Sequence, residues 1–202
     1  MVRAILQPGG RGCRAQRADN GYSMVEATVV VAAVLVLSAV SVLRIQSVRA
    51  TSQADNACYT VLGSLRQARR SALTEQRKFV VTFTTPGLIV VQRVEPNLQL
   101  TEISRATLLS GMEFRAEPGI PTSTHDTPDH FGTGSVAIHF NGGNQIFFHS
   151  DGSARDATGR VNNGVVYMAR RGDIGSSRAV TLFGATGRIK DWRLSPLAWR
   201  WI

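Results

Sequence analysis

A run of seventeen uncharged residues, 27–43, restricts the possible folds of this chain more than any other feature. Most of these residues are Val, Ala or Leu, whereas apolar residues elsewhere come in short runs broken by Gly, Pro, Asn and Thr. As a helix, the run is about 25 Å long at ~1.5 Å per residue, and adding residues 22–25 gives about 33 Å. The hydrocarbon core of a bilayer is about 30 Å thick. The sequence therefore predicts one transmembrane helix at residues 22–44.

The net charge of +9 is concentrated at the two ends of the chain. Residues 1–21 carry a net charge of +3, residues 22–154 a net charge of zero, and residues 155–202 a net charge of +6. Arginines that precede a transmembrane segment favour a cytoplasmic N-terminal side. We therefore expect the residues after Arg44 to lie on the other side of the membrane.

One carboxylate does not fit a simple membrane anchor. Glu26 lies inside the apolar stretch, where an ionised carboxylate costs about 2.5–3.5 kcal/mol on insertion scales. Either Glu26 marks the edge of the membrane, or it has a partner and a function. A secretory signal peptide is the weaker explanation, because its basic region would exceed twenty residues and a Glu would open its apolar region.

The hexapeptide that starts at Gly21, Gly-Tyr-Ser-Met-Val-Glu, follows the basic leader and opens the apolar run. This arrangement resembles the type IV prepilin cleavage signal. The resemblance implies that a prepilin peptidase cuts after Gly21 and methylates the new N-terminal residue, Tyr22. It also implies that Glu26 pairs with the N-terminal amine of a neighbouring subunit in a filament, which would neutralise its charge in a low-dielectric environment. Residues 1–21 are then a basic prepilin leader.

Apolar residues continue at three- and four-residue steps after the membrane segment, which predicts an amphipathic continuation of the helix over residues 45–78. The positions on its apolar face are Ile45, Val48, Ala54, Cys58, Val61, Leu62, Leu65, Ala68, Ala72 and Leu73. Cys58 is expected to be buried as a small hydrophobe. Because the other cysteine, Cys13, lies in the leader, a mature chain would have no intramolecular disulfide.

Beyond Lys78 the apolar pattern changes to that of strands, and residues 79–202 are expected to form a β-rich head on the outer side of the membrane. Turn sequences at residues 85–87 and 141–144 predict two hairpins. The fold class is therefore α+β, with a long N-terminal transmembrane and amphipathic helix packed on a mostly antiparallel β head. The predicted strands are 79–84, 88–94, 98–103, 108–115, 136–140, 145–149, 165–170, 179–183 and 188–194.

Residues 117–134 are rich in Pro, Thr, Gly and Asp and are expected to form a long loop. Four potential metal ligands lie between His125 and His130, but their spacing matches no zinc or calcium template. A solvated loop is the preferred interpretation, and no metal site is predicted.

The later region of the head also resembles a particular group. Residues 148–153 (Phe-His-Ser-Asp-Gly-Ser), a strand at 179–182 and residues 186–189 (Thr-Gly-Arg-Ile) are similar to the ending of the GspH/FimT minor pseudopilins. The resemblance implies a structural subunit that joins other pseudopilins or pilins in a filament and supports filament assembly and protein secretion. It further implies a single-pass protein of the bacterial inner membrane with a cytoplasmic N-terminus and a periplasmic head, which can enter the filament. A type II secretion pseudopilus is the first choice and a type IV pilus the second.

The basic C-terminal region leaves a further function open. Residues 187–190, Gly-Arg-Ile-Lys, are similar to a Gly-Arg-x-Arg motif with which some type IV pilus members of the group bind DNA, although Lys190 lacks the bidentate fork of arginine. DNA is therefore a possible partner. The basic residues that would contact phosphates lie among Trp192, Trp199 and Trp201, and they are Arg188, Lys190, Arg193 and Arg200.

A structural role is the alternative for the same residues. The arginines would then be the solvated side of a terminal hairpin, and its apolar residues would face the core: Val180, Leu182, Ile189, Trp192 and Leu194.

No catalytic motif supports an enzyme. The sequence has no Gly-x-Ser-x-Gly elbow, no phosphate-binding loop and no His-Glu-x-x-His. The four His residues, at positions 125, 130, 139 and 149, have no matching nucleophile or carboxylate pair. We expect neither enzymatic activity nor a cofactor.

Overall fold

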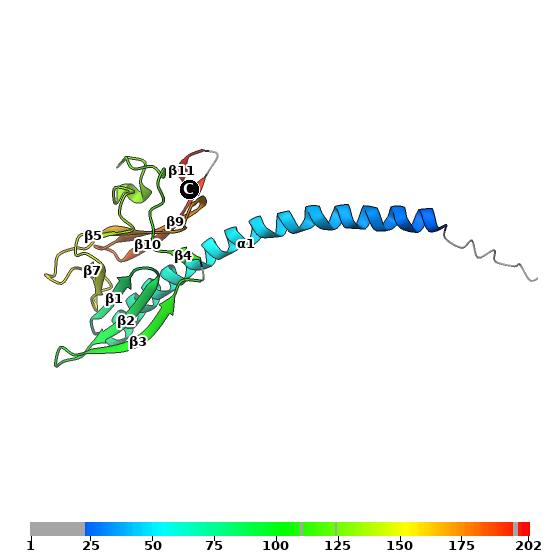
Figure 1. Ribbon diagram of the computed structural model, residues 1–202. Coiled ribbons are helices and arrows are strands. Elements are labelled where there is room, and N and C mark those ends of the chain that lie inside the picture. Colours follow the sequence, from blue (N-terminus) through cyan, green and yellow to red (C-terminus); the bar gives the residue numbers. More distant parts are fainter. Residues whose placement is uncertain (1–22, 110, 124, 196–197) are drawn as a thin grey trace, which may run out of the picture. The chain divides into compact units, whose positions relative to one another are not determined.

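The structure is a computed structural model that describes residues 23–202 except 110, 124 and 196–197, with side chains described outside residues 40–48. Two predicted features lie outside the described residues: the leader, residues 1–21, which includes Gly21, and Tyr22. The chain divides into two compact units, residues 1–44 and 45–202. The fold is α+β (Figure 1), and its elements are α1 (Met24–Glu75), β1 (Phe79–Thr84), β2 (Leu88–Val94), β3 (Leu100–Thr107), β4 (Met112–Glu113), η1 (Pro128–His130), β5 (Ile138–Phe140), β6 (Gln145–Phe148), β7 (Ala154–Arg155), β8 (Gly164–Arg170), β9 (Asp173–Phe183), β10 (Arg188–Ser195) and β11 (Arg200–Trp201).

Within the second unit, α1 buries one stripe of apolar residues, as its periodicity predicts. The stripe consists of Ala54, Ala57, Cys58, Val61, Leu62, Leu65, Ala68 and Ala72. Leu73, which was expected on the same face, is 41% exposed. The side chains of Ile45 and Val48 lie outside the described residues.

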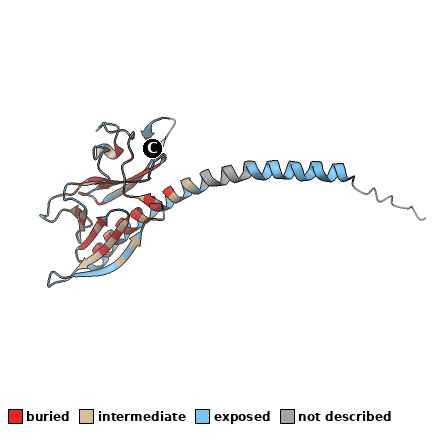
Figure 2. Cartoon of the chain, viewed as in Figure 1, coloured by how far each residue is buried: buried red, intermediate tan, exposed pale blue. Residues whose placement is uncertain are grey.

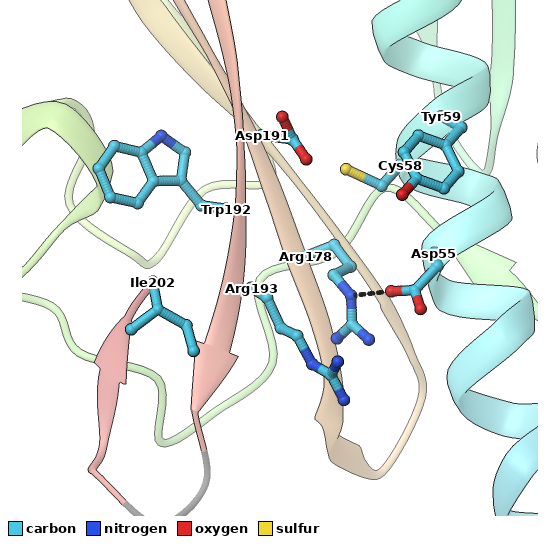
Figure 3. Close-up of a pocket in the computed structure, with 8 residues that line it drawn as sticks. All are labelled: Asp55, Cys58, Tyr59, Arg178, Asp191, Trp192, Arg193 and Ile202. Atoms are coloured by element: carbon cyan, nitrogen blue, oxygen red, sulfur yellow. Dashed lines mark hydrogen bonds and ion pairs between the residues drawn. The ribbon is translucent and has the colours of Figure 1, made fainter.

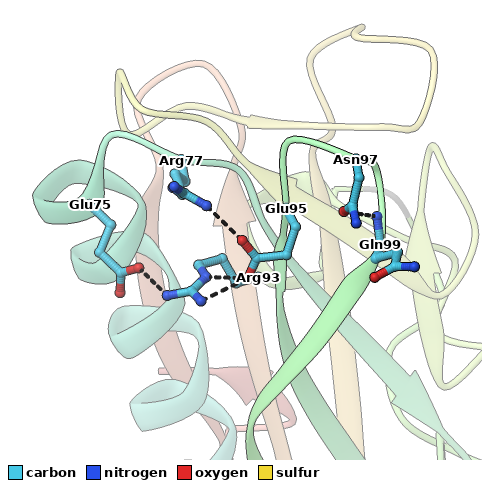
Figure 4. Close-up of polar contacts among 6 residues, drawn as sticks. All are labelled: Glu75, Arg77, Arg93, Glu95, Asn97 and Gln99. Carbon is cyan, nitrogen blue, oxygen red and sulfur yellow. Dashed lines mark hydrogen bonds and ion pairs between the residues drawn. The ribbon is translucent and has the colours of Figure 1, made fainter.

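The helix ends at Glu75 for a local reason. Gln76 takes a left-handed conformation with φ of 54°, which commonly terminates a helix. Its side-chain amide donates to the Leu73 carbonyl at 2.7 Å, which satisfies one of the free carbonyls of the last turn. Ion pairs then join this end of the helix to the end of β2: Arg77 contacts Glu95 at 2.6 Å, and Arg93 contacts Glu75 at 3.0 Å (Figure 4).

Two antiparallel sheets form the rest of the second unit. The first has the strand order β3-β2-β1-β6-β7, and the second has the order β11-β10-β9-β8-β4, with β5 also paired to β8. Apolar side chains from α1 and from both sheets make one core, seen as buried residues in Figure 2. In its centre the ring of Phe83 meets those of Phe114 and Phe140 at centroid distances of 5.6 and 6.0 Å.

The first predicted hairpin, around residues 85–87, is confirmed, but the second, around residues 141–144, is wrong. β5 pairs with β8, whereas β6 pairs with β1 of the other sheet. Asn144 fixes this change of sheet, because its carbonyl accepts from the Phe83 amide at 3.0 Å and its side chain donates to the Phe83 carbonyl at 2.9 Å. The turn sequence thus correctly indicates a reversal, but the chain crosses between sheets there.

Other strand boundaries differ in detail from the predictions. The predicted strand at 108–115 reduces to the two residues of β4, and the predicted strand at 98–103 is β3, at Leu100–Thr107. The short strands β7 and β11 were not predicted.

The loop at residues 117–134 lies against the sheet rather than being fully solvated, which corrects the expectation from its composition. Ile120 and Pro128 are buried, and Phe131 packs on the same apolar cluster as Ile120. That cluster, on the side of the second sheet opposite the main core, contains Ile120, Val165, Tyr167, Ala179, Leu194 and Trp201.

The terminal hairpin β9–β10 therefore has apolar residues on both faces. Val180, Leu182 and Ile189 contact the main core, whereas Trp192 and Leu194 belong to the second cluster. The prediction that all five face one core is wrong, because successive residues of a strand point to opposite faces and Ile189 differs in parity from the other two of β10.

Candidate functional site

Of the residues expected to direct processing and assembly, the structure describes Glu26. The Ser23 carbonyl accepts the amide of Ala27 at 3.0 Å, so Ser23 is the N-cap and Glu26 lies in the first turn of α1. An ionised carboxylate is favourable there, because the free amides of the first turn give this end a partial positive charge. The spacing of Ser23 and Glu26 is that of a capping box. Glu26 is thus suited to the start of this helix even before any partner is considered.

The helix that follows Glu26 is apolar on all sides. Each residue from 23 to 39 is exposed, and the consecutive Val29, Val30 and Val31, which point in three directions around the axis, are 62%, 52% and 58% exposed. A helix that is hydrophobic all round is normally buried, in a protein or in a membrane. The apolar run 27–43 continues past residue 39 into side chains outside the described set. Within the described residues, no helix is both long and apolar enough to cross a membrane.

The basic residues of β10 face an acidic partner that the sequence did not indicate. Arg188 and Lys190 both lie close to one Oδ1 atom of Asp129, at 3.8 and 3.4 Å. Asp129 comes from η1, in the loop that covers this face of the sheet, and only 14% of its side chain is exposed. The Asp129 carboxylate therefore already compensates some of the charge of these two cations.

A hydrogen-bond chain holds Asp129 in place. The Thr181 hydroxyl donates to Asp129 Oδ2 at 2.6 Å, and the indole of Trp192 donates to the Thr181 hydroxyl at 3.0 Å. Aromatic rings also support the cations, since Arg188 lies over Phe183 and Lys190 over Trp192 at 5.1 and 5.2 Å from the ring centroids. The arrangement is a compact polar cluster on a sheet face, in which one carboxylate compensates part of the charge of two cations.

The four basic residues expected to act together do not share one surface. Arg188 and Lys190 lie on the face of β10 that meets the loop, whereas Arg193 has the opposite parity and lines a different pocket beside α1. Arg200, on β11, lines a groove of about 480 Å³ together with Asp129 and Trp192, so it lies near the Asp129 cluster rather than near Arg193. Figure 3 shows Arg193 beside Arg178.

The two histidines of the loop, His125 and His130, line the same groove. Their rings lie 5.6 Å apart between centroids and at 59° to each other. Across the described residues of the chain, no group of three or more His, Cys, Asp or Glu side chains could hold a metal ion.

Cys58 has the environment of a core residue. It is 4% exposed, and burial, together with the charge of Asp191, raises the pKa of its thiol to about 12. A thiol with so high a pKa is a poor nucleophile at neutral pH. The prediction that Cys58 is a buried hydrophobe is confirmed.

Two arginines that join α1 to the sheets were not predicted from the sequence. Arg69 donates to the Gly152 carbonyl at 3.2 Å and to the Thr186 carbonyl at 2.9 Å. It thus joins α1 to the two turns within residues 148–153 and 186–189. Arg178, 2% exposed, pairs with Asp55 of α1 at 2.8 Å. The sequence spacing of both arginines indicates an inward position. Arg69 lies four residues after the buried Leu65 of the same helix, and Arg178 lies two residues before the buried Val180, on the same face of β9.

No protein-family model matches this sequence, and no curated protein matches it. Solved structures to which this chain is similar include the minor pseudopilin EpsH of the type 2 secretion system of Vibrio cholerae, at 12% identity over 70% of this chain and 97% of that one, with a TM-score of 0.48. A second structure of that protein matches at 11% identity over 70% and 94%, with a TM-score of 0.46. The type IV minor pilin FimU of Pseudomonas aeruginosa matches at 10% identity over 72% and 89%, with a TM-score of 0.43.

Proposed function

We propose that this chain is a minor pilin-like subunit, anchored in the bacterial inner membrane by residues 22–44, whose periplasmic head joins a type II secretion pseudopilus. A type IV pilus is the second choice of filament. The observation that carries the proposal is the contrast within α1: residues 24–39 expose apolar side chains in every direction, while the later turns bury theirs in a β-rich head. Such a helix requires an apolar environment from outside the chain, either a membrane or the helices of other subunits.

The residues that open this helix support the same proposal. The basic leader, Gly21, Tyr22 and Glu26 occur in the order of a prepilin signal. A prepilin peptidase would cut after Gly21 and methylate Tyr22. The new amine, four residues before Glu26, is the cation that would compensate a neighbouring subunit's carboxylate in the filament.

Binding of extracellular DNA through the basic C-terminal region is the less favoured alternative. Arg188 and Lys190 are within ion-pair distance of Asp129, and Arg193 lies on the other face of β10. A DNA phosphate near these two cations would be repelled by the Asp129 carboxylate. If DNA is nevertheless the ligand, affinity falls with salt and falls further in the Arg188→Gln/Lys190→Gln variant, and unchanged affinity removes this alternative.

A substitution of Glu26 tests the proposed function. We expect Glu26→Gln to be cleaved by the peptidase as the wild type is, yet to be lost from the filament fraction obtained by shearing or cross-linking. Glu75→Gln is the matched control, because Glu75 is a carboxylate of the same helix whose exposed pair with Arg93 contributes little, and it should assemble normally. Entry of Glu26→Gln into filaments at the wild-type level would contradict the proposal.

The choice of filament is a separate measurement. Deleting the gene should abolish secretion of exoproteins if the filament is a pseudopilus, and should abolish surface pili and twitching if it is a type IV pilus.

A further inference from the structure

Two arginines lie directly opposite each other on neighbouring strands of the second sheet. Arg178 of β9 and Arg193 of β10 are cross-strand partners in the antiparallel register. The Cβ atoms of such a pair are about 4.5–5.5 Å apart, and like charges at this separation destabilise a sheet. Both side chains line one pocket beside α1 (Figure 3).

The Arg178 guanidinium has one ion-pair partner but is incompletely hydrogen-bonded. Its Nε donates to Asp55 at 2.8 Å, and Nη1 donates to the Gly175 and Ser177 carbonyls at 3.2 and 3.0 Å. Its Nη2 is buried and has no hydrogen-bond partner among the described residues. Asp55 is thus the carboxylate that balances Arg178.

No carboxylate of the described residues lies within 4.0 Å of the Arg193 guanidinium, which is exposed. The pocket lining therefore carries two arginines and two carboxylates, Asp55 and Asp191, and only Asp55 forms an ion pair with one of these arginines, Arg178. Like charges placed opposite each other in a sheet break the rule that cross-strand charges should be opposite. Such local departures are expected at functional sites, including sites that bind another molecule. An anion bound to Arg193 would offset the repulsion between the two arginines.

The pocket can admit one side chain of another protein, and its rim exposes two large side chains. Its volume is about 210 Å³, enough for the end of one acidic side chain. Tyr59 of α1, 61% exposed, and Ile202, 60% exposed, lie at its margin. Tyrosine and arginine are the residue types that most often dominate protein–protein interfaces, and an apolar rim gains from contact with another protein rather than with a free ion.

A further charged group lines the pocket, and it makes the two ends of the pocket opposite in charge. Asp191 lies two residues before Arg193 on the same face of β10, at the end of the pocket near Cys58. An incoming carboxylate is repelled by Asp191 and attracted by Arg193. An acidic group is therefore expected to enter the pocket at its Arg193 end and not at its Asp191 end.

We propose that this notch, formed by Asp55, Tyr59, Arg178, Asp191 and Arg193, receives an Asp or Glu side chain of a neighbouring protein, whose carboxylate binds Arg193. The inference rests on the proposed function only in identifying that neighbour as another subunit of the filament. It adds a head-to-head contact to the contacts made by the apolar helix.

Photocross-linking in cells that express the full chain tests the inference. A p-benzoylphenylalanine probe replaces Tyr59, and the cross-linked peptide is identified by mass spectrometry. The expected product is a segment of one protein that contains Asp or Glu. Arg193→Gln should lower its yield about tenfold or more, as expected for loss of one partner of a charge pair.

Asp191→Asn is the matched control, since it removes a charge of the opposite sign from the same pocket and strand face. Its yield should equal or exceed that of the wild type. Changing the identified acidic residue to Gln should cause the same loss as Arg193→Gln, with no further loss when the two are combined. Thermal unfolding of each variant verifies that the head is intact.

Several outcomes overturn the inference: no cross-link, a cross-link to lipid, a peptide without an acidic residue, or a yield that Arg193→Gln does not change. Failure of the proposed function is recognised separately by the N-terminus of the same protein. A processed chain without the cross-link contradicts the notch alone, whereas an unprocessed chain with an acidic cross-link contradicts the filament alone.

Discussion

Residues 24–39 and residues 49–75 are two segments of one helix, α1, yet their apolar side chains have opposite environments. Every residue of the first segment is exposed, and its large apolar side chains are between 52% and 88% exposed. These side chains are Met24, Val25, Val29, Val30, Val31, Val34, Leu35, Val36 and Leu37. The second segment instead buries a stripe, from Ala54 to Ala72, under two sheets. The second segment is thus stabilised from within the chain, whereas the first requires stabilisation from outside it.

The largest expected effect compares the same substitution in the two segments. Leu65, fully buried, and Leu35, 65% exposed, both lie in α1. Leu65→Ala should destabilise the head by about 2–5 kcal/mol, because it removes a core side chain and leaves a cavity. Leu35→Ala should change the free energy of unfolding by less than about 0.5 kcal/mol.

Urea unfolding of the full chain in detergent, followed by tryptophan fluorescence, measures both variants. The signal comes from the head, because all three tryptophans lie at positions 192, 199 and 201. Equal effects at the two positions would show that the contrast between the two segments is wrong.

A smaller effect is expected where α1 is joined to the turns of the head. Gly187 has a φ of 63°, and a Cβ there would meet the Gly152 carbonyl and, at 2.6 Å, Nε of Arg69. Gly187→Ala should cost about 1–3 kcal/mol, because neither the carbonyl nor the clamped arginine can move freely.

Gly63 is the matched control for this substitution. It lies within α1, and a Cβ there would meet nothing within 4 Å. Gly63→Ala should stabilise the head by about 0.4–1 kcal/mol, since it reduces the entropy of the unfolded chain. Thermal unfolding of both variants measures the difference, and destabilisation by Gly63→Ala would contradict the space seen around this helix.

The smallest expected effect is a pH dependence confined to the head. Burial, with Lys78 and Arg155 nearby, lowers the pKa of His149 below its ordinary value of 6.5. The unfolded state then binds the proton more tightly, so stability present above pH 6.5 is lost as the pH falls from that value towards the folded pKa. His149→Gln should flatten the stability profile below about pH 6.5, and an unchanged slope there would contradict the role of His149.

Features that depend on local periodicity could be predicted from the sequence. The buried stripe of α1 and the first hairpin follow from three- and four-residue steps and from alternation, which act over a few residues. The partner of β6 could not be predicted in this way, because the turn at residues 141–144 indicates a reversal and not which strand is joined. Its true partner, β1, depends on the contacts of Asn144 with Phe83, 61 residues away.

In the candidate site, too, local features were predictable from the sequence and long-range contacts were not. Alternation along β10 was sufficient to separate Arg193 from Arg188 and Lys190, although these residues were first grouped by their closeness in sequence. The partner of the latter two, Asp129, could not be found from the sequence, because it is brought to them by a loop that packs on the sheet. The position of Glu26 in the first turn of α1 depends only on consecutive residues, and its role in assembly stays a prediction.

The proposal that the first segment of α1 is released from a leader and then covered outside the chain is tested most directly by its N-terminus. The measurement is intact mass and N-terminal sequencing of the membrane-extracted protein, expressed with and without a prepilin peptidase. The proposal predicts a peptidase-dependent N-terminus at Tyr22 that carries one added methyl group. A chain that still begins at Met1 in the presence of the peptidase, or one cut beyond Ser38, would contradict it.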